Sequence, residues 1–216
     1  MGFVIAVDGP AASGKGTIAA RLGEAFDLPV LDSGLLYRAV GLAAAAAGAD
    51  LDDGEACARA ARGLDFSRLD DPALRTRAAA QAASRVAVHP SVRQSLIAFQ
   101  RAFGERDSGA VIDGRDIGTV IVPDAPAKLY VTAAAKVRAH RRWRQLEAEG
   151  ETIALADILA DIEARDRRDA QRAASPMRAA ADAVLLDTTD LDIDRAFDAA
   201  RRIVETARAR WSNPDG

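Results

Sequence analysis

The clearest indication of the fold is the glycine-rich segment at residues 9–17, Gly9-Pro10-Ala11-Ala12-Ser13-Gly14-Lys15-Gly16-Thr17. It follows an apolar run at residues 3–7 and leads into residues 18–26, where large apolar side chains recur every four positions. This order predicts a strand, a glycine-rich loop and a helix that packs one face on a sheet. The backbone N–H groups of such a loop, at a helix N-terminus, can surround a polyphosphate.

The loop follows the phosphate-binding pattern with one residue inserted before the threonine, so Gly16 stands where the general motif has Ser or Thr. Lys15 supplies a full positive charge, and Thr17 supplies a hydroxyl that can face Mg²⁺. The alternative is an ordinary strand-to-helix turn with glycines chosen for tight geometry. Lys15 is one of three lysines in a chain with 29 Lys and Arg residues, which indicates that a compact ammonium is needed there.

Length and composition limit the class of protein. The 216 residues suit a single domain, and a net charge of −3 argues against a protein that mainly coats nucleic acid or an anionic membrane. We expect neither a nucleic-acid nor a membrane partner, and we expect a monomer. The single cysteine, Cys57, excludes an internal disulfide and is a better candidate for core filler than for a nucleophile. No leader or membrane-spanning pattern occurs, so we expect a cytoplasmic protein.

Short apolar runs alternate with helical segments along the chain. The runs lie at residues 3–7, 30–31, 110–112, 128–132 and 183–186. We expect an α/β fold with a five-stranded parallel sheet and helices on both faces. Ser33 is a candidate N-cap for the helix after the second strand. Residues 50–106 are helical in composition, broken at Gly63, Asp71-Pro72 and His89-Pro90, and we expect a helical insertion rather than a separate domain.

Two clusters of charge are candidates for chemistry. Asp113-Gly114-Arg115-Asp116 follows the third apolar run, at the sheet edge where ligands bind in open α/β folds. Asp113 can hold Mg²⁺ directly or through water, or instead cap the following turn. Arg165, Asp169 and Arg172 share one face of a helix that we expect to run from about residue 152 until Ser175-Pro176 ends it. A solvated, salt-bridged helix is the alternative to an arginine lid over phosphates at residues 150–177. The two histidines, His89 and His140, do not make a metal site.

These motifs together resemble the bacterial cytidylate kinases, a family of nucleoside monophosphate kinases. The resemblance rests on the loop, on Leu31-Asp32-Ser33-Gly34-Leu35-Leu36-Tyr37-Arg38, on Asp113-Gly114-Arg115-Asp116-Ile117-Gly118-Thr119, on Pro123-Asp124-Ala125-Pro126, and on Arg165-Asp166-Arg167-Arg168-Asp169 with Arg172. It extends over nearly the whole chain. It implies transfer of phosphate from ATP, with Mg²⁺, to CMP and dCMP.

The resemblance also implies roles for individual residues. ATP phosphates would bind residues 9–17: Gly9, Pro10, Ala11, Ala12, Ser13, Gly14, Lys15, Gly16 and Thr17. The CMP phosphate would meet Ser33 and Arg38, and the cytosine edge would be read by Ser84, Arg93 and Asp116. The ribose would meet Asp169 and Arg165. Phosphates would also meet Arg172 and Arg115. Lys15, Arg115, Arg165 and Arg172 would be the catalytic set, acting by charge neutralisation in a direct, in-line transfer. Ser84 and Arg93, taken alone, are ordinary polar residues of a helical segment.

One departure from the family pattern concerns the acceptor-binding insertion. Many relatives carry a small antiparallel sheet there, whereas here Leu64-Asp65-Phe66 passes through Asp71-Pro72 almost directly into helix. We expect a pocket that closes with less rearrangement. Two rival functions remain open: a P-loop kinase for another nucleotide or for a metabolite such as shikimate, and a nucleotide-gated RNA-binding module that uses the arginines of residues 138–172.

Overall fold

The structure is a computed structural model and describes residues 2–213. Its centre is a five-stranded sheet in the order β2-β3-β1-β4-β5, and every pair of neighbouring strands is parallel. The strands are β1 (Val4–Asp8), β2 (Val30–Asp32), β3 (Ala110–Gly114), β4 (Ala127–Thr132) and β5 (Val184–Asp187). The helices are α1 (Lys15–Phe26), α2 (Ser33–Ala46), α3 (Gly54–Arg62), α4 (Arg77–Val86), α5 (Pro90–Gly104), α6 (Ala135–Ala148), α7 (Leu155–Gln171) and α8 (Ile193–Ser212). The predicted fold class is confirmed.

Alternate residues of β1 face opposite sides of the sheet, as the two-residue period of a strand requires. Ile5 and Val7 join an apolar cluster with residues of α1 and α8, and Val4 and Ala6 join a second cluster with residues of β3 and the segment after it. Every residue of β1 is buried. The sheet is therefore covered on both faces, and its C-terminal edge is left for polar groups.

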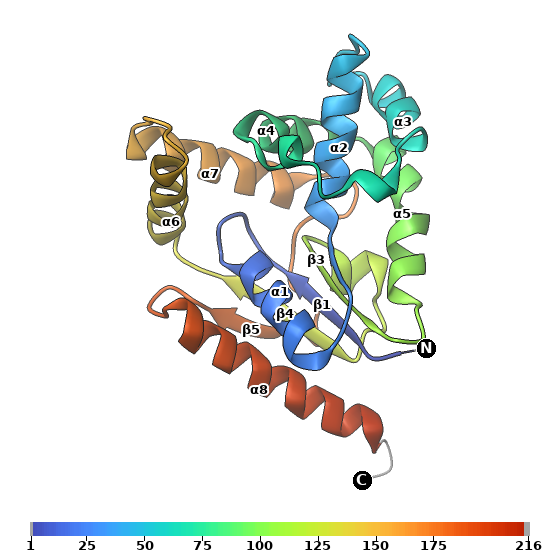
Figure 1. Cartoon of the computed structure of the whole chain (residues 1–216), viewed down its shortest axis with the longest axis vertical. Coiled ribbons are helices and arrows are strands. Elements are labelled where there is room, and N and C mark those ends of the chain that lie inside the picture. The colour runs from blue at the N-terminus through green and yellow to red at the C-terminus, as the bar shows by residue number, and fades with distance from the viewer. Residues whose placement is uncertain (1, 214–216) are drawn as a thin grey trace.

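Helices α2–α5 form a layer above the sheet, and α6 and α7 lie to its left (Figure 1). A third apolar cluster, running in sequence from Leu36 to Leu96, joins these four helices. Within the described residues, the chain between β2 and β3 contains helices and the short 3₁₀ turns η1 (Phe66–Arg68) and η2 (Pro72–Arg75) but no strand. This agrees with the helical insertion expected from the sequence.

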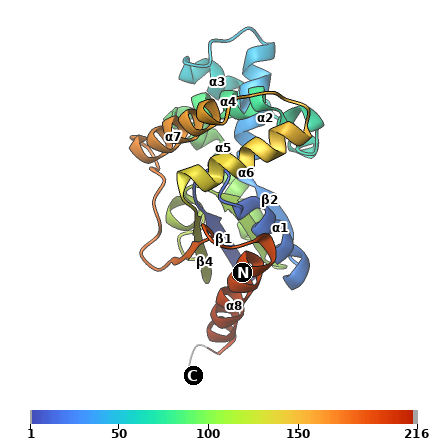
Figure 2. The same ribbon diagram turned by 90° about the vertical axis from the view of Figure 1, so that its left-hand side faces the viewer.

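Helices α6 and α7 pack on each other through Ala139, Leu146, Ile158 and Ile162. In Figure 2, α7 lies at the level of α4, and α6 lies between that level and the sheet. Their polar residues can therefore reach both the loop after β1 and the helical layer. None of the helices within residues 2–213 is long and apolar enough to cross a bilayer.

A helix cap, a helix end and a turn differ from what the sequence predicts. Asp32, not Ser33, caps α2, because its carboxylate accepts a hydrogen bond from the Gly34 N–H at 2.8 Å. Helix α7 ends at Gln171, so Arg172 has an extended backbone (ψ 135°) and lies beyond the helical face assigned to it. A π-helical turn, η3 (Ile117–Ile121), follows β3, and no sequence pattern indicated it. Such turns are frequent at functional sites.

Candidate active site

The glycine-rich loop connects β1 to α1 in a backbone shape that most residues avoid. Gly9 has φ of 143°, and a Cβ there would lie 2.0 Å from the carbonyl oxygen of Val131 in β4. Ala12 has φ of 59°, a conformation that costs a non-glycine residue about 1–3 kcal/mol. Strain of this kind persists only where neighbouring groups hold it.

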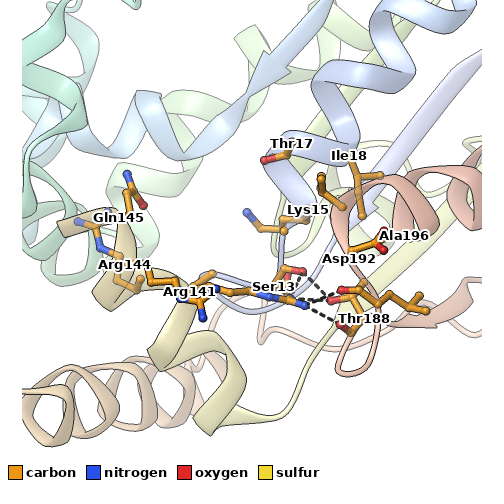
Figure 3. Close-up of a pocket in the computed structure, with 16 residues that line it drawn as sticks. Ser13, Lys15, Thr17, Ile18, Arg141, Arg144, Gln145, Thr188, Asp192 and Ala196 are labelled. Carbon is orange, nitrogen blue, oxygen red and sulfur yellow. Dashed lines mark hydrogen bonds between the residues drawn. The ribbon is translucent and has the colours of Figure 1, made fainter. Parts of the chain in front are cut away.

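Residues of helix α6 and of the segment after β5 hold the loop by its carbonyl oxygens. The Ser13 carbonyl accepts hydrogen bonds from the Thr188 hydroxyl at 3.0 Å and from the Arg141 guanidinium at 3.4 Å (Figure 3). Arg138 of α6 donates to the Ala11 carbonyl at 3.2 Å. Because these carbonyls are bound from outside, the loop keeps its N–H groups for an anion.

A cavity of about 600 Å³ opens against this loop. Residues 12–18 form one wall, and the other walls come from α6 and from the β5–α8 connection. The Lys15 ammonium and the Thr17 hydroxyl point to the same side of the loop (Figure 3). All nine loop residues predicted to bind ATP are thus in one segment, and residues 12–17 of it line the cavity.

Lys15 and Asp113 form an ion pair where the loop meets β3. The Lys15 Nζ lies 3.0 Å from one Asp113 carboxylate oxygen and 3.3 Å from the other. Burial lowers the pKa of Lys15 and raises the pKa of Asp113. A Cβ at Gly16 would lie 3.2 Å from Asp113 Oδ2, so glycine at this position of the loop lets the carboxylate approach closely.

A second cavity, of about 590 Å³, lies between the helical layer and α7. Of the residues predicted to bind CMP, Arg38, Ser84 and Arg165 line it. Arg38 is held by a hydrogen bond of 2.9 Å to the Leu74 carbonyl oxygen. The guanidinium groups from α2, α4 and α7 that line this cavity belong to Arg38, Arg77, Arg85, Arg165 and Arg168. Such a convergence of positive charge suits an anionic ligand.

A buried cluster of charge lies next to that cavity and contains the remaining acceptor candidates. Arg93 of α5 pairs with Asp116, and Asp169 pairs with Arg115 at 3.2 Å and with Arg165 at 3.9 Å. Burial raises the pKa of Asp169, but Arg115 and Arg165 outweigh that effect and hold it below its usual range. Burial, followed by the charge of Arg115, lowers the pKa of Arg165 to about 10.

Arg172 adds a further guanidinium to the cluster, so four arginines face two aspartates. Within residues 2–213, Nε of Arg93, Nε of Arg165 and Nη2 of Arg172 are buried without a hydrogen-bond acceptor. A buried donor without an acceptor costs about 1–3 kcal/mol. Surplus positive charge and unpaired donors together fit a ligand rich in phosphate and carbonyl oxygens.

The structure brings most predicted residues together, with three differences. Arg93, Asp116, Asp169 and Arg172 are buried and Arg115 is half-buried, and none of them lines the second cavity. The Ser84 hydroxyl is covered, because it accepts a hydrogen bond from Arg168 of α7. Ser33 is buried at the end of β3, where a Cβ on Gly114 would lie 2.6 Å from its Oγ.

Sequence reasoning missed the residues that hold the glycine-rich loop (residues 9–17, below called the donor loop). Arg138 is buried, donates to Ala133 O at 2.7 Å and pairs with Asp166 at 2.6 Å, besides its contact with Ala11. Thr188 is also buried. The available signal was position: an arginine-rich helix directly after β4, and a Thr pair directly after β5. Both places lie at the ligand-binding edge of a parallel sheet.

A metal site is supported by position rather than by a cluster of ligands. No group of three or more His, Cys, Asp or Glu side chains in the described part of the chain could hold a metal ion. Mg²⁺ at phosphate-binding sites usually needs only one or two protein ligands, because phosphates and water complete its shell. Thr17, which lines the first cavity, and Asp113, which lies against Lys15 and Gly16 of the loop, fit that requirement.

Comparison with known proteins agrees with this geometry. A family model described as cytidylate kinase matches residues 5–206. A cytidylate kinase of Caulobacter sp. (strain K31) is 62% identical over 216 residues, which is 100% of both chains. One from Caulobacter vibrioides (strain NA1000 / CB15N) is 63% identical over 210 residues, covering 97% of this chain and 99% of the relative.

A solved structure of an uncharacterized protein from Eubacterium ventriosum is similar in fold. It aligns with a TM-score of 0.53 at 15% identity and covers 94% of this chain and 99% of its own. A likeness at that identity speaks for the fold alone. The sequence relatives carry the assignment: over its full length, this chain belongs to the cytidylate kinase family.

Proposed function

We propose that this protein transfers the γ-phosphoryl group of ATP to CMP or dCMP, giving ADP and CDP or dCDP. The observation that carries the proposal is the position of the Lys15–Asp113 pair, where a phosphate-binding loop with its own cavity meets an arginine-lined second cavity. Membership of the cytidylate kinase family identifies the acceptor as a cytosine nucleotide.

The donor phosphates lie on residues 9–17 in this account. The loop's N–H groups meet the phosphate oxygens, and Lys15 adds a full charge where negative charge shifts during transfer. Thr17 and Asp113 hold Mg²⁺, directly or through water. The metal, when bound, neutralises phosphate charge and orients the terminal phosphate for attack.

The acceptor phosphate meets Arg38 and Ser33 on one side and Arg115, Arg165 and Arg172 on the other. Arg115, Arg165 and Arg172, with Lys15, form the catalytic set and stabilise charge on the transferred group. Asp169 holds Arg115 and Arg165 in place and accepts a ribose hydroxyl. Residues 50–106 act as the acceptor-binding insertion, and residues 150–177 act as the lid.

The base lies against Ser84, Arg93 and Asp116. Cytosine presents an exocyclic amine beside a ring nitrogen and a carbonyl oxygen, so it needs an acceptor next to donors. Asp116 supplies the acceptor, and Arg93 and Ser84 supply donors. The direct Arg93–Asp116 pair and the Arg168 bond to Ser84 then exchange in part for bonds to the base.

An ADP-release assay with ATP and Mg²⁺ tests the proposal against six acceptors in parallel: CMP, dCMP, UMP, AMP, GMP and shikimate. We expect CMP and dCMP to give the highest kcat/KM. A higher value for another acceptor would leave the donor site intact and overturn the acceptor assignment. Failure to phosphorylate any of them would overturn the function, and RNA binding with steep salt dependence would then support the non-enzymatic alternative.

A further inference from the structure

A buried carboxylate outside the sites described above connects the two halves of the active site. Asp8 is the last residue of β1 and directly precedes Gly9, the first glycine of the donor loop. It is 4% exposed and lies between Gly114 of β3 and Tyr130 of β4 in the sheet register. Within residues 2–213, no ion pair involves Asp8.

Both oxygens of this carboxylate accept backbone hydrogen bonds from the segment that follows β3. Oδ1 accepts from the Ile117 N–H at 2.8 Å, and Oδ2 accepts from the Gly118 N–H at 2.8 Å. These two residues begin the π-helical turn, and the two residues before them are Arg115 and Asp116. Asp8 thus binds the chain directly beside the residues assigned to the transferred phosphate and the base.

The Asp116 side chain makes no capping bond to the turn that it precedes. It is directed instead to Arg93. Because Asp8 supplies the acceptor that the first N–H groups of this turn need, Asp116 is released from capping and can face the base.

The surroundings of Asp8 make ionisation of its carboxyl group unfavourable. Burial, with smaller contributions from the charges of Asp116 and Asp113, raises the pKa of Asp8 to about 6, although the two amides act in the opposite direction. Tyr130 and Lys128 also lie near this carboxylate, and the Lys128 ammonium bonds to Asp182 and to the Pro123 carbonyl oxygen. An Asn side chain has nearly the same shape but only one acceptor oxygen, so it can accept from only one of the two amides.

We propose that Asp8 is a positioning residue for base specificity, which fixes Asp116, and through it Arg93, relative to the donor loop by holding the Ile117 and Gly118 amides. The inference rests on the proposed role of Asp116 and Arg93 in reading cytosine. It adds a residue of the donor strand to the determinants of acceptor choice.

The test compares Asp8→Asn with wild type and with Ile5→Val, a buried change in the same strand whose side chain packs in the cluster with α1 and α8, whereas Ile117 and Ile121 belong to the other cluster. We expect the ratio of kcat/KM for CMP to that for UMP to fall about tenfold in Asp8→Asn, because one of two charge-assisted bonds is lost. We expect Ile5→Val to keep the wild-type ratio. A loss of general stability would not change this ratio.

Amide hydrogen exchange provides a second measurement that does not depend on activity. At least one of the Ile117 and Gly118 amides, the one whose acceptor oxygen is lost, should exchange about tenfold faster in Asp8→Asn than in wild type. Both amides should exchange at the wild-type rate in Ile5→Val. An unchanged CMP/UMP ratio or unchanged exchange would overturn the proposal. Failure of Asp8→Asn to fold would also overturn it, since Asp8 would then be a purely structural residue. If wild type itself does not prefer CMP, the proposed function fails, and the exchange rates still report whether Asp8 holds the turn.

Discussion

At the scale of single residues, the active site contains buried charged groups that reduce the stability of the fold but serve the proposed reaction. Asp8 is the clearest case, because its pKa is raised to about 6 and not lowered as in a stabilising ion pair. The folded protein therefore binds this proton more tightly than the unfolded chain does, and ionisation of Asp8 reduces the stability of the fold.

Asp8 should make stability depend on pH in a defined direction. Relative to Asp8→Asn, wild type is expected to lose about 3 kcal/mol of unfolding free energy as the pH rises from about 4 to about 6, with no further loss above that. Urea unfolding of both proteins at several pH values measures the difference. A difference that is constant across this range would contradict the raised pKa.

Lys15 is expected to act in transfer and not in substrate binding alone. Lys15→Met should lower kcat by about 10²–10³, a loss of about 3–4 kcal/mol of transition-state stabilisation. Because the pKa of Asp113 is already raised by burial, this carboxyl can take up a proton when its partner is removed, and the variant should still fold. Lys136→Met, at an exposed position of α6, is the control. Near-normal kcat in Lys15→Met would refute the loop assignment.

The functional role of a residue could be predicted from the sequence only where the residues next to it in the chain form a recognisable pattern. Lys15 and Thr17 were readable because the loop motif is contiguous, and Asp113 because it follows an apolar strand. Ser84 and Arg93 came only from the family resemblance, since a polar residue on a helix has no local mark of function. Asp8 and Thr188 act through backbone groups more than a hundred residues away, and no local pattern reports such contacts.

At the scale of elements, close packing of α2 on α4 positions the helix that carries Ser84. A Cβ at Gly41 would lie 2.6 Å from the Ala82 Cβ and 3.0 Å from the Ala82 carbonyl carbon. The helices approach this closely only because Gly41 has no side chain. Any residue larger than glycine must push α4 away from α2.

Gly41→Ala is therefore expected to destabilise the fold by about 1–3 kcal/mol through overpacking. Its KM for CMP should rise, because displacement of α4 moves Ser84. Gly63→Ala is the matched control: its Cβ meets nothing closer than 3.7 Å, so the change should leave stability nearly unchanged. Thermal unfolding and acceptor kinetics of both variants check this, and equal stability of the two would disprove the packing argument.

Element types were predictable from periodicity, but several boundaries were not. The strands appear within about a residue or two of their predicted places, because apolar runs and glycine or proline breaks mark them. Asp32 replaced Ser33 as the cap of α2 because both residue types can cap, and backbone geometry decides between them. The end of α7 at Gln171 and the π-helical turn after β3 depend on tertiary contacts, such as that with Asp8.

At the scale of the whole molecule, the helical layer already touches α7, the helix of the proposed lid. Arg77 of α4 pairs with Asp161 of α7 at 2.6 Å, and Arg168 of α7 bonds to Ser84 of α4. The described residues between β2 and β3 contain no strand, so the regular elements of this layer are all helical. We expect binding of CMP to require local exchange of these contacts rather than a large swing of domains.

Small-angle scattering tests this expectation. Profiles recorded with and without saturating CMP should be nearly superimposable. A large compaction on adding CMP would show that the shortened insertion still closes by rearrangement, and would contradict the expectation.

In the proposed function, the buried Arg93–Asp116 pair reads the acceptor base. The most direct measurement is kcat/KM for CMP and for UMP in wild type and in Asp116→Asn. Uracil carries a carbonyl oxygen where cytosine carries an amine, and the Asn amide can donate to that oxygen. We expect kcat/KM to fall about 10²-fold or more for CMP and to change little for UMP, because a site built for one hydrogen-bond pattern is penalised when a buried group is left unpaired. An equal loss for both nucleotides would contradict the claim.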